Sequence, residues 1–175
     1  MGDAGTIFFH DASGWAEVQP SPTVEDLHGV WGTAADDFHV VGANGTLLRY
    51  DGTAWDTLTD PLLTTATLYA VWGLSAHHVL AAGTEGTLLY FDGAQWTEME
   101  SPAEQDLRGL WGHDHTSIFA VGDELLHFDG VAWSRMSPSV SVPWLNAVWA
   151  PAPDQAFAVG SSRLYRFSFD LPTLD

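Results

Sequence analysis

The sequence predicts an all-β protein built from repeats of about 40 residues, and three observations support this prediction. A hexapeptide, Leu68 to Gly73, recurs three more times along the chain. A short apolar run that stops at a glycine follows each copy, and an Asp-Gly turn follows most of them. No segment combines helical periodicity with capping residues. At 175 residues, the repeats are expected to form a single domain over residues 1–175.

The repeat is defined by anchors that return at nearly constant spacing. They divide the chain into units at about 1–26, 27–67, 68–106, 107–144 and 145–175, of which the first and last are partial. The anchors are the hexapeptide tryptophans Trp31, Trp72, Trp111 and Trp149, the glycines Gly42, Gly83, Gly122 and Gly160, the turn residues Asp51, Asp92 and Asp129, and the second tryptophans Trp55, Trp96 and Trp133.

Each unit is expected to contain four short strands, a to d, in chain order. Strands a, b and c are rich in branched and aromatic residues, and glycine or Asp-Gly turns separate them. Such a four-stranded antiparallel meander, repeated radially, is the blade of a β-propeller. The expected strands are 27–32, 68–73, 107–112 and 145–150 for a, 38–41, 79–82, 118–121 and 156–159 for b, 46–50, 87–91, 125–128 and 164–167 for c, and those beginning at Trp55, Trp96 and Trp133 for d.

The two partial units leave the closure of the ring open. Residues 2–6 align with the turn that precedes strand c, so 7–10 is expected to be a strand c and 15–18 a strand d. In one alternative these strands complete the last unit and close a ring of four to five blades. In the other, the chain is an arc of a larger ring. It is then completed by further sequence of a longer protein, or by a second chain that pairs through open blade edges to give a homo-oligomer.

The charge balance restricts the partners. The chain has 5 basic and 23 acidic residues, a net charge of −18, which disfavours nucleic acid and acidic membranes. Cations, basic proteins and neutral sugars are compatible with it. There is no cysteine, so disulfides and thiolate sites are excluded, and no apolar stretch is long enough for membrane insertion.

The turn Tyr50-Asp51-Gly52-Thr53-Ala54-Trp55 and its two copies resemble a shortened Asp-box of sialidase-like and photosystem assembly-factor-like propellers. The string Val71-Trp72-Gly73, followed by Ala82-Gly83 and 86–96, is similar to repeats of bacterial, mostly extracytoplasmic propeller proteins. The resemblance implies a propeller fold, structural Asp-box turns and a secreted or cell-envelope location, and it implies no particular ligand. The turn at 11–15 is altered, and the last unit lacks it.

Eight of the nine tryptophans occupy repeat positions, which predicts a packing role for them. Burying one such side chain is worth about 4–6 kcal/mol before entropy costs. Trp144 stands outside the repeat and is the better ligand candidate. The predicted structural anchors are Trp31, Trp72, Trp111, Trp149, Trp15, Trp55, Trp96, Trp133, Asp51, Asp92 and Asp129.

The best candidate for a binding site is a set of positions that vary inside an otherwise regular repeat. The residue directly after the strand a leucine differs in every unit, and the residue directly before that leucine also varies. In a propeller, strand a lines the central channel, and its start lies on the face where ligands usually bind. The polar and aromatic types found there suit recognition of polar ligands or proteins. The candidates are Asp26, His28, Thr67, Tyr69, Asp106, Arg108, Trp144 and Asn146.

These observations favour a non-enzymatic binding module that recognises a carbohydrate, in a lectin-like manner, or a protein. The alternative is a structural unit that assembles through its blade edges, and a sialidase-like or other hydrolase is the least favoured interpretation. The sequence offers no nucleophile–base–orienter set. The pairs His77-His78 and His113-Asp114-His115 fix no third ligand by spacing, so neither a metal nor another cofactor is expected.

Overall fold

The computed structural model describes residues 2–136, 144–161 and 163–168. Strands dominate it, and its described helical elements are two single 3-10 turns, η1 (Asp3–Gly5) and η2 (Thr84–Gly86). Over these residues no helix is long and apolar enough to cross a membrane. The strands are β1 (Phe8–Asp11), β2 (Gly14–Glu17), β3 (Leu27–Ala34), β4 (Asp37–Gly42), β5 (Leu47–Tyr50), β6 (Trp55–Thr57), β7 (Leu68–Ser75), β8 (His78–Gly83), β9 (Leu88–Phe91), β10 (Trp96–Glu98), β11 (Leu107–Asp114), β12 (Ser117–Gly122), β13 (Leu125–Phe128), β14 (Trp133–Arg135), β15 (Ala147–Ala152), β16 (Gln155–Gly160) and β17 (Arg163–Ser168).

The strands form five antiparallel sheets that follow one another along the chain. Three sheets are four-stranded meanders, β3 to β6, β7 to β10 and β11 to β14. The described part of the last sheet has three strands, β15 to β17, and β1 pairs with β2 in a hairpin. These are the strands that the repeat predicts, with ends that differ by about two residues.

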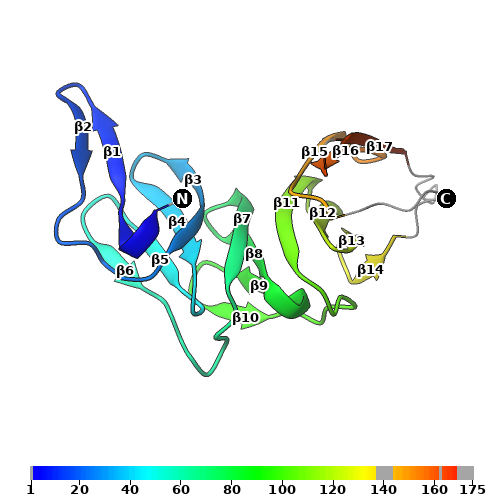
Figure 1. The fold of residues 1–175 in the computed structure, drawn as a ribbon, viewed down its shortest axis with the longest axis horizontal. Coiled ribbons are helices and arrows are strands. Elements are labelled where there is room, and N and C mark those ends of the chain that lie inside the picture. The colour runs from blue at the N-terminus through cyan, green and yellow to red at the C-terminus, as the bar shows by residue number, and fades with distance from the viewer. Residues whose placement is uncertain (1, 137–143, 162, 169–175) are drawn as a thin grey trace.

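The sheets stand side by side in an arc, each offering its first strand to the inner side (Figure 1). β3 lies next to β7, β7 next to β11, and β11 next to β15. The fourth strands, β6, β10 and β14, lie on the outer side. This arrangement brings the equivalent start of every first strand to one face of the arc.

Hydrophobic side chains fill the junctions between neighbouring sheets. In the middle junction, Trp72 and Leu88 of one sheet meet Leu107 and Leu126 of the next. The Trp72 ring also lies against Gly112, where an added Cβ would come 2.4 Å from Cη2 of that ring. The Trp-Gly pair of the hexapeptide therefore has a packing reason at two junctions, because Gly73 and Gly112 leave room for Trp31 and Trp72 of the preceding sheets.

The repeat tryptophans are buried only where a neighbouring sheet or strand covers them. Three of them are buried, Trp72, Trp96 and Trp133, and three are half-buried, Trp31, Trp55 and Trp111. Trp15 and Trp149 differ, since 75% and 52% of their surfaces are exposed. Both stand on elements at the two ends of the arc, where no described sheet lies opposite them.

The Asp-Gly turns are fixed by a carboxylate that accepts backbone hydrogen bonds. Oδ1 of Asp51 accepts the N–H groups of Thr53 and Ala54, each at 2.8 Å. Asp92 and Asp129 make the equivalent pairs of bonds in their own turns. The backbone N–H groups of Ala54 and Thr53 lower the pKa of Asp51 to about 2. The following Gly52 has φ +90°, a region that glycine adopts without strain.

The first and last described sheets do not meet. The β1–β2 hairpin stands beside β3 at one end of the arc, and β15 to β17 form the other end (Figure 1). The first alternative from the sequence, in which the N-terminal strands complete the last unit, is therefore not the arrangement found. The physical reason is that the described sheets turn through only part of a circle, so β1 pairs with β2 alone.

Candidate functional site

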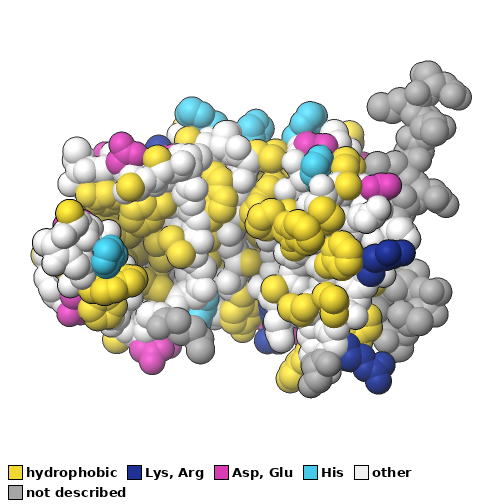
Figure 2. Space-filling model, turned by 90° about the horizontal axis from the view of Figure 1, so that it is seen from above, with side chains coloured by type: hydrophobic (Ala, Val, Ile, Leu, Met, Phe, Trp, Pro, Cys, Tyr) yellow, Lys and Arg dark blue, Asp and Glu magenta, His cyan; other side chains and the backbone are white. Residues whose placement is uncertain are grey.

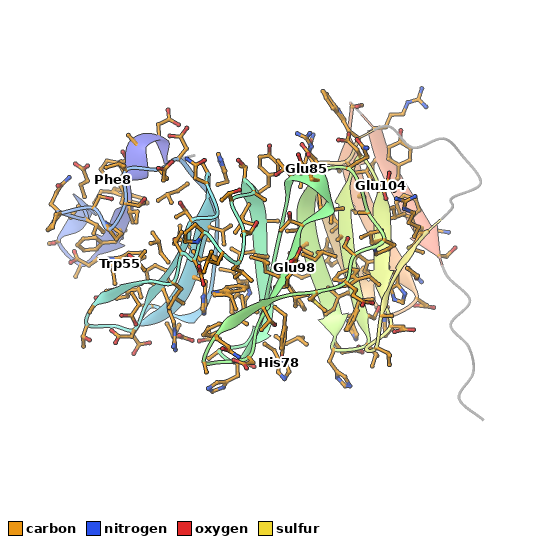
Figure 3. The ribbon with its side chains drawn as sticks, turned by 90° about the horizontal axis from the view of Figure 1, so that it is seen from below. Phe8, Trp55, His78, Glu85, Glu98 and Glu104 are labelled. Carbon is orange, nitrogen blue, oxygen red and sulfur yellow. The ribbon has the colours of Figure 1, made fainter. Side chains whose placement is uncertain are left out.

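The candidate site lies on the face that carries the turns between second and third strands and the connections between sheets. We call it the channel face. Figure 3 separates it from the opposite face, because Glu85 and Glu104 lie toward one edge of the molecule and His78 toward the other. Backbone hydrogen bonds hold this face together, with N–H of Ala43, Thr84 and Asp123 donating to the carbonyl groups of Asp26, Thr67 and Asp106.

Four of the predicted residues form a continuous row of ring and cation contacts across neighbouring sheets. His28 of β3 lies 5.6 Å from Tyr69 of β7, measured between ring centroids. The guanidinium of Arg108 on β11 lies 5.5 Å from the Tyr69 ring and 5.6 Å from the Trp144 ring. We call these four residues, His28, Tyr69, Arg108 and Trp144, the channel-face row.

Arg108 is placed between two aromatic rings and two carboxylates. Its Nη2 lies 3.1 Å from Oδ2 of Asp106 and 3.6 Å from Oδ2 of Asp123. Its side chain is about one-third exposed, so these pairs are screened by solvent and hold the guanidinium in position more than they stabilise the fold. Cation–π contact of this kind also favours a fixed guanidinium plane.

The remaining predicted residues have different surroundings. Oδ1 of Asp26 accepts N–H of Ala4 at 2.8 Å, and Oδ1 of Asp106 accepts N–H of Glu85 at 3.3 Å. Each of these two carboxylates therefore joins the start of a first strand to the turn of the preceding unit, so both have a structural role. Thr67 is half-buried beside the row, and Asn146 is exposed. The structure thus brings together His28, Tyr69, Arg108 and Trp144, and it engages Asp26 and Asp106 in the scaffold.

The opposite face carries histidines near the turns between first and second strands. The hydroxyl of Tyr90 and Nδ1 of His78 form a hydrogen bond. Within residues 2–136, 144–161 and 163–168, no three His, Cys, Asp or Glu side chains are grouped so that they could hold a metal ion. The histidine pairs of neighbouring units do not form such a group there.

Two features of the structure were missed by reasoning from the sequence. Asp123 is a partner of Arg108, and its signal was its place in the shortened turn of the third unit. The second feature is a cavity of about 960 Å³ between the β1–β2 hairpin and β3. Its walls are largely hydrophobic, and Figure 2 shows it as a hollow at the left end of the molecule. No feature of the sequence predicts this cavity, because Val30, which lines it, occupies a position that is buried in the three following units.

Comparison with known proteins places the fold. No family model matches the sequence, and no curated protein sequence matches it. Solved structures do match, beginning with the WD40 β-propeller domain of Doa1, which is 10% identical with a TM-score of 0.74 over 93% of this chain and 56% of that one. The chain has a β-propeller fold.

Two further structures agree with this fold. YCF48, solved with a bound D1 peptide, is 20% identical with a TM-score of 0.69 over 96% of this chain and 59% of that one. The computationally designed Ika4 protein is 12% identical with a TM-score of 0.65 over 83% of this chain and 92% of that one. The propeller described here therefore spans less than two-thirds of the Doa1 and YCF48 chains. Identities this low speak for the fold alone.

Proposed function

We propose that this propeller is a non-enzymatic binding protein whose channel-face row recognises a basic segment of a partner protein. The observation that carries the proposal is the continuity of the row, in which side chains from three neighbouring sheets and from the connection before the fourth contact one another in sequence on a regular scaffold. Aromatic and arginine side chains at the centre of a surface are typical of recognition sites.

Charge favours a basic partner. Carboxylates surround the row, since Asp26, Asp106, Asp123 and Glu85 all lie at the start of first strands or in the adjoining turns. Asp106 and Asp123 already offset the single guanidinium of the row. In a chain with a net charge of −18, such a face attracts cationic groups and repels anionic ones.

The comparisons support a protein partner over a carbohydrate. YCF48, a propeller of similar fold, was solved with a bound peptide. The row also lacks the nucleophile with base and orienting group that a hydrolase needs. A carbohydrate ligand and a hydrolytic activity are the competing interpretations, and glycan arrays with glycosidase and ester substrates test them.

The test is binding of a lysine- and arginine-rich peptide library, alongside a glycan array, to the protein and to a Tyr69→Ala, Trp144→Ala double variant, which leaves the charge of the face unchanged. We expect peptide capture that weakens with added salt and falls by at least about tenfold in the double variant. Val131→Ala, at an exposed outer turn, is the matched control and should bind as the parent does. Full binding by a folded double variant would mean that the row is not the site. Capture of glycans alone, lost in the double variant, would replace the protein partner by a carbohydrate.

A further inference from the structure

One face of the first four-stranded sheet is formed by Val30, Phe38, Val40 and Tyr50, and we call it the leading face. It is open at Val30, whereas Val40 is 5% exposed and packs in a cluster with Ile7 of the N-terminal segment. In the following sheets this face is covered by the sheet before it. Val71, Leu110 and Val148 occupy the position of Val30 in their units and are 8–9% exposed, whereas Val30 is 68% exposed. The cavity beside β3 lies over this face.

The last sheet has a complementary open face, formed by Trp149, Phe157, Val159, Leu164 and Arg166, which we call the trailing face. Strand pairing places these residues together, since Trp149 is opposite Phe157, and Phe157 is opposite Arg166. Trp149 is 52% exposed and Leu164 67%, while the equivalent Trp72 and Leu88 are 6% and 0% exposed. The trailing face therefore has the composition of a buried junction but no described sheet opposite it.

We propose that the trailing face of one copy packs on the leading face of a second copy, in the register that joins neighbouring sheets within the chain. In that register Trp149 lies against Gly32 of the second copy, as Trp72 lies against Gly112. Val30 of the second copy becomes covered, as Val71 is covered. This goes beyond the binding role of the channel-face row, which lies on a different surface.

Charge supports a second copy as the occupant. Within the chain, the Arg49 guanidinium lies 5.9 Å from the Phe91 ring across the first junction. Arg166 occupies the position of Arg49, and Tyr50 that of Phe91. A second copy therefore offers an aromatic ring to Arg166. Among the described residues, no carboxylate forms an ion pair with Arg163 or Arg166. Figure 2 shows arginine side chains at the right end of the molecule, whereas the cavity lies at the left end.

The β1–β2 hairpin stands over part of the leading face and has to move outward when the second copy binds. In the described chain it pairs with no other strand, and the backbone bridge between Gly2 and Leu27 joins its base to β3. β1 is the third strand of its repeat unit, as β17 is of the last unit. β1 therefore occupies the position that β17 of the second copy has to take. The space over β3, by contrast, is vacant and suits β15 and β16.

The first experiment measures the mass of the full chain by sedimentation at concentrations up to about 200 μM. We expect concentration-dependent association, weakened at least about 30-fold in Trp149→Ala and in Val30→Asp, because each removes a central contact. Both residues are exposed in the isolated chain, so both variants should fold, which circular dichroism checks. Leu62→Asp, at a residue 94% exposed in another turn, is the matched control and should associate as the parent does.

A mixture of the two variants tests the head-to-tail geometry. Val30→Asp keeps its trailing face and Trp149→Ala keeps its leading face, so together they should form a dimer although neither associates alone. A parent chain that stays monomeric up to about 200 μM would overturn the proposal. So would undiminished association of either variant, or a mixture that stays monomeric while the parent associates. None of these results bears on the channel-face row, which the peptide assay tests separately.

Discussion

The middle junction and the trailing face are built from the same repeat positions, yet one is core and the other is surface. Trp72 and Leu88 are buried between two sheets, whereas Trp149 and Leu164 face solvent. The side chains are identical, so the difference lies only in whether a second sheet stands opposite. A repeat protein therefore forms its core between pairs of neighbouring sheets, and a face without a neighbour leaves the same hydrophobic side chains exposed.

The most direct test of this difference is to truncate the equivalent tryptophan in the middle junction and on the trailing face. Trp72→Ala should lower the free energy of unfolding by about 3–5 kcal/mol, because it opens a cavity between two sheets. Trp149→Ala should lower it by at most about 1 kcal/mol in dilute, monomeric protein. Urea unfolding followed by fluorescence measures both, and equal losses would mean that the trailing face is already covered.

A second test adds one methyl group to a junction. Gly112→Ala should lower the free energy of unfolding by about 3 kcal/mol, the upper end of the usual effect of overpacking. The new Cβ would come 2.4 Å from Trp72 and 2.9 Å from Ile118. The control is Ala150→Gly in the last sheet, where the equivalent residue of the other sheets is glycine. It should change the free energy of unfolding by about 0.5–1 kcal/mol. A stable Gly112→Ala variant would contradict the close contact with Trp72.

The first junction contains a fully buried histidine. His39 is buried against the rings of Phe91 and Trp96, and neither ring nitrogen has a hydrogen-bond partner among the described residues. Burial, aided by the charge of Arg49, lowers the pKa of His39 to about 4 from 6.5. Leu80 and Phe119 occupy the same position in the next two units.

This histidine makes the first junction sensitive to acid. Between the unfolded pKa of 6.5 and the folded pKa of about 4, the unfolded chain binds the proton and the folded chain does not. The free energy of unfolding should therefore fall by about 2 kcal/mol from pH 7 to about pH 5. His39→Leu should remove this dependence. Parallel pH profiles of the two proteins would contradict the assignment to His39.

The smallest expected effect concerns the edge of the trailing face. Leu164→Asn should change the free energy of unfolding by no more than about 0.5 kcal/mol, since the side chain is solvated in the isolated chain. Leu88→Asn is its matched partner at the buried position and should be severely destabilised. Thermal melts at low protein concentration compare the two variants. A large loss for Leu164→Asn would reveal a covering element at the trailing face.

The sequence predicted which face carries the candidate site, but not which of its residues contact one another. The repeat placed His28, Tyr69 and Arg108 at equivalent positions, so their common face could be predicted. It could not show that Trp144 reaches back over Arg108, or that Asp26 and Asp106 bind backbone N–H groups of a preceding turn. Those contacts depend on the angle between neighbouring sheets, which local periodicity does not encode.

Local features of the sequence specify the sheets of this propeller. Period, turn residues and alternation act within about 40 residues, so they fix strands and their order along the chain. The curvature of the arc depends instead on how neighbouring sheets pack, and it places β1–β2 and β15–β17 at opposite ends. The curvature of the arc is the sum of small rotations between neighbouring sheets. Because these rotations leave the first and last described sheets apart, equivalent hydrophobic residues are buried within the arc but face solvent at its end, as Trp149 does.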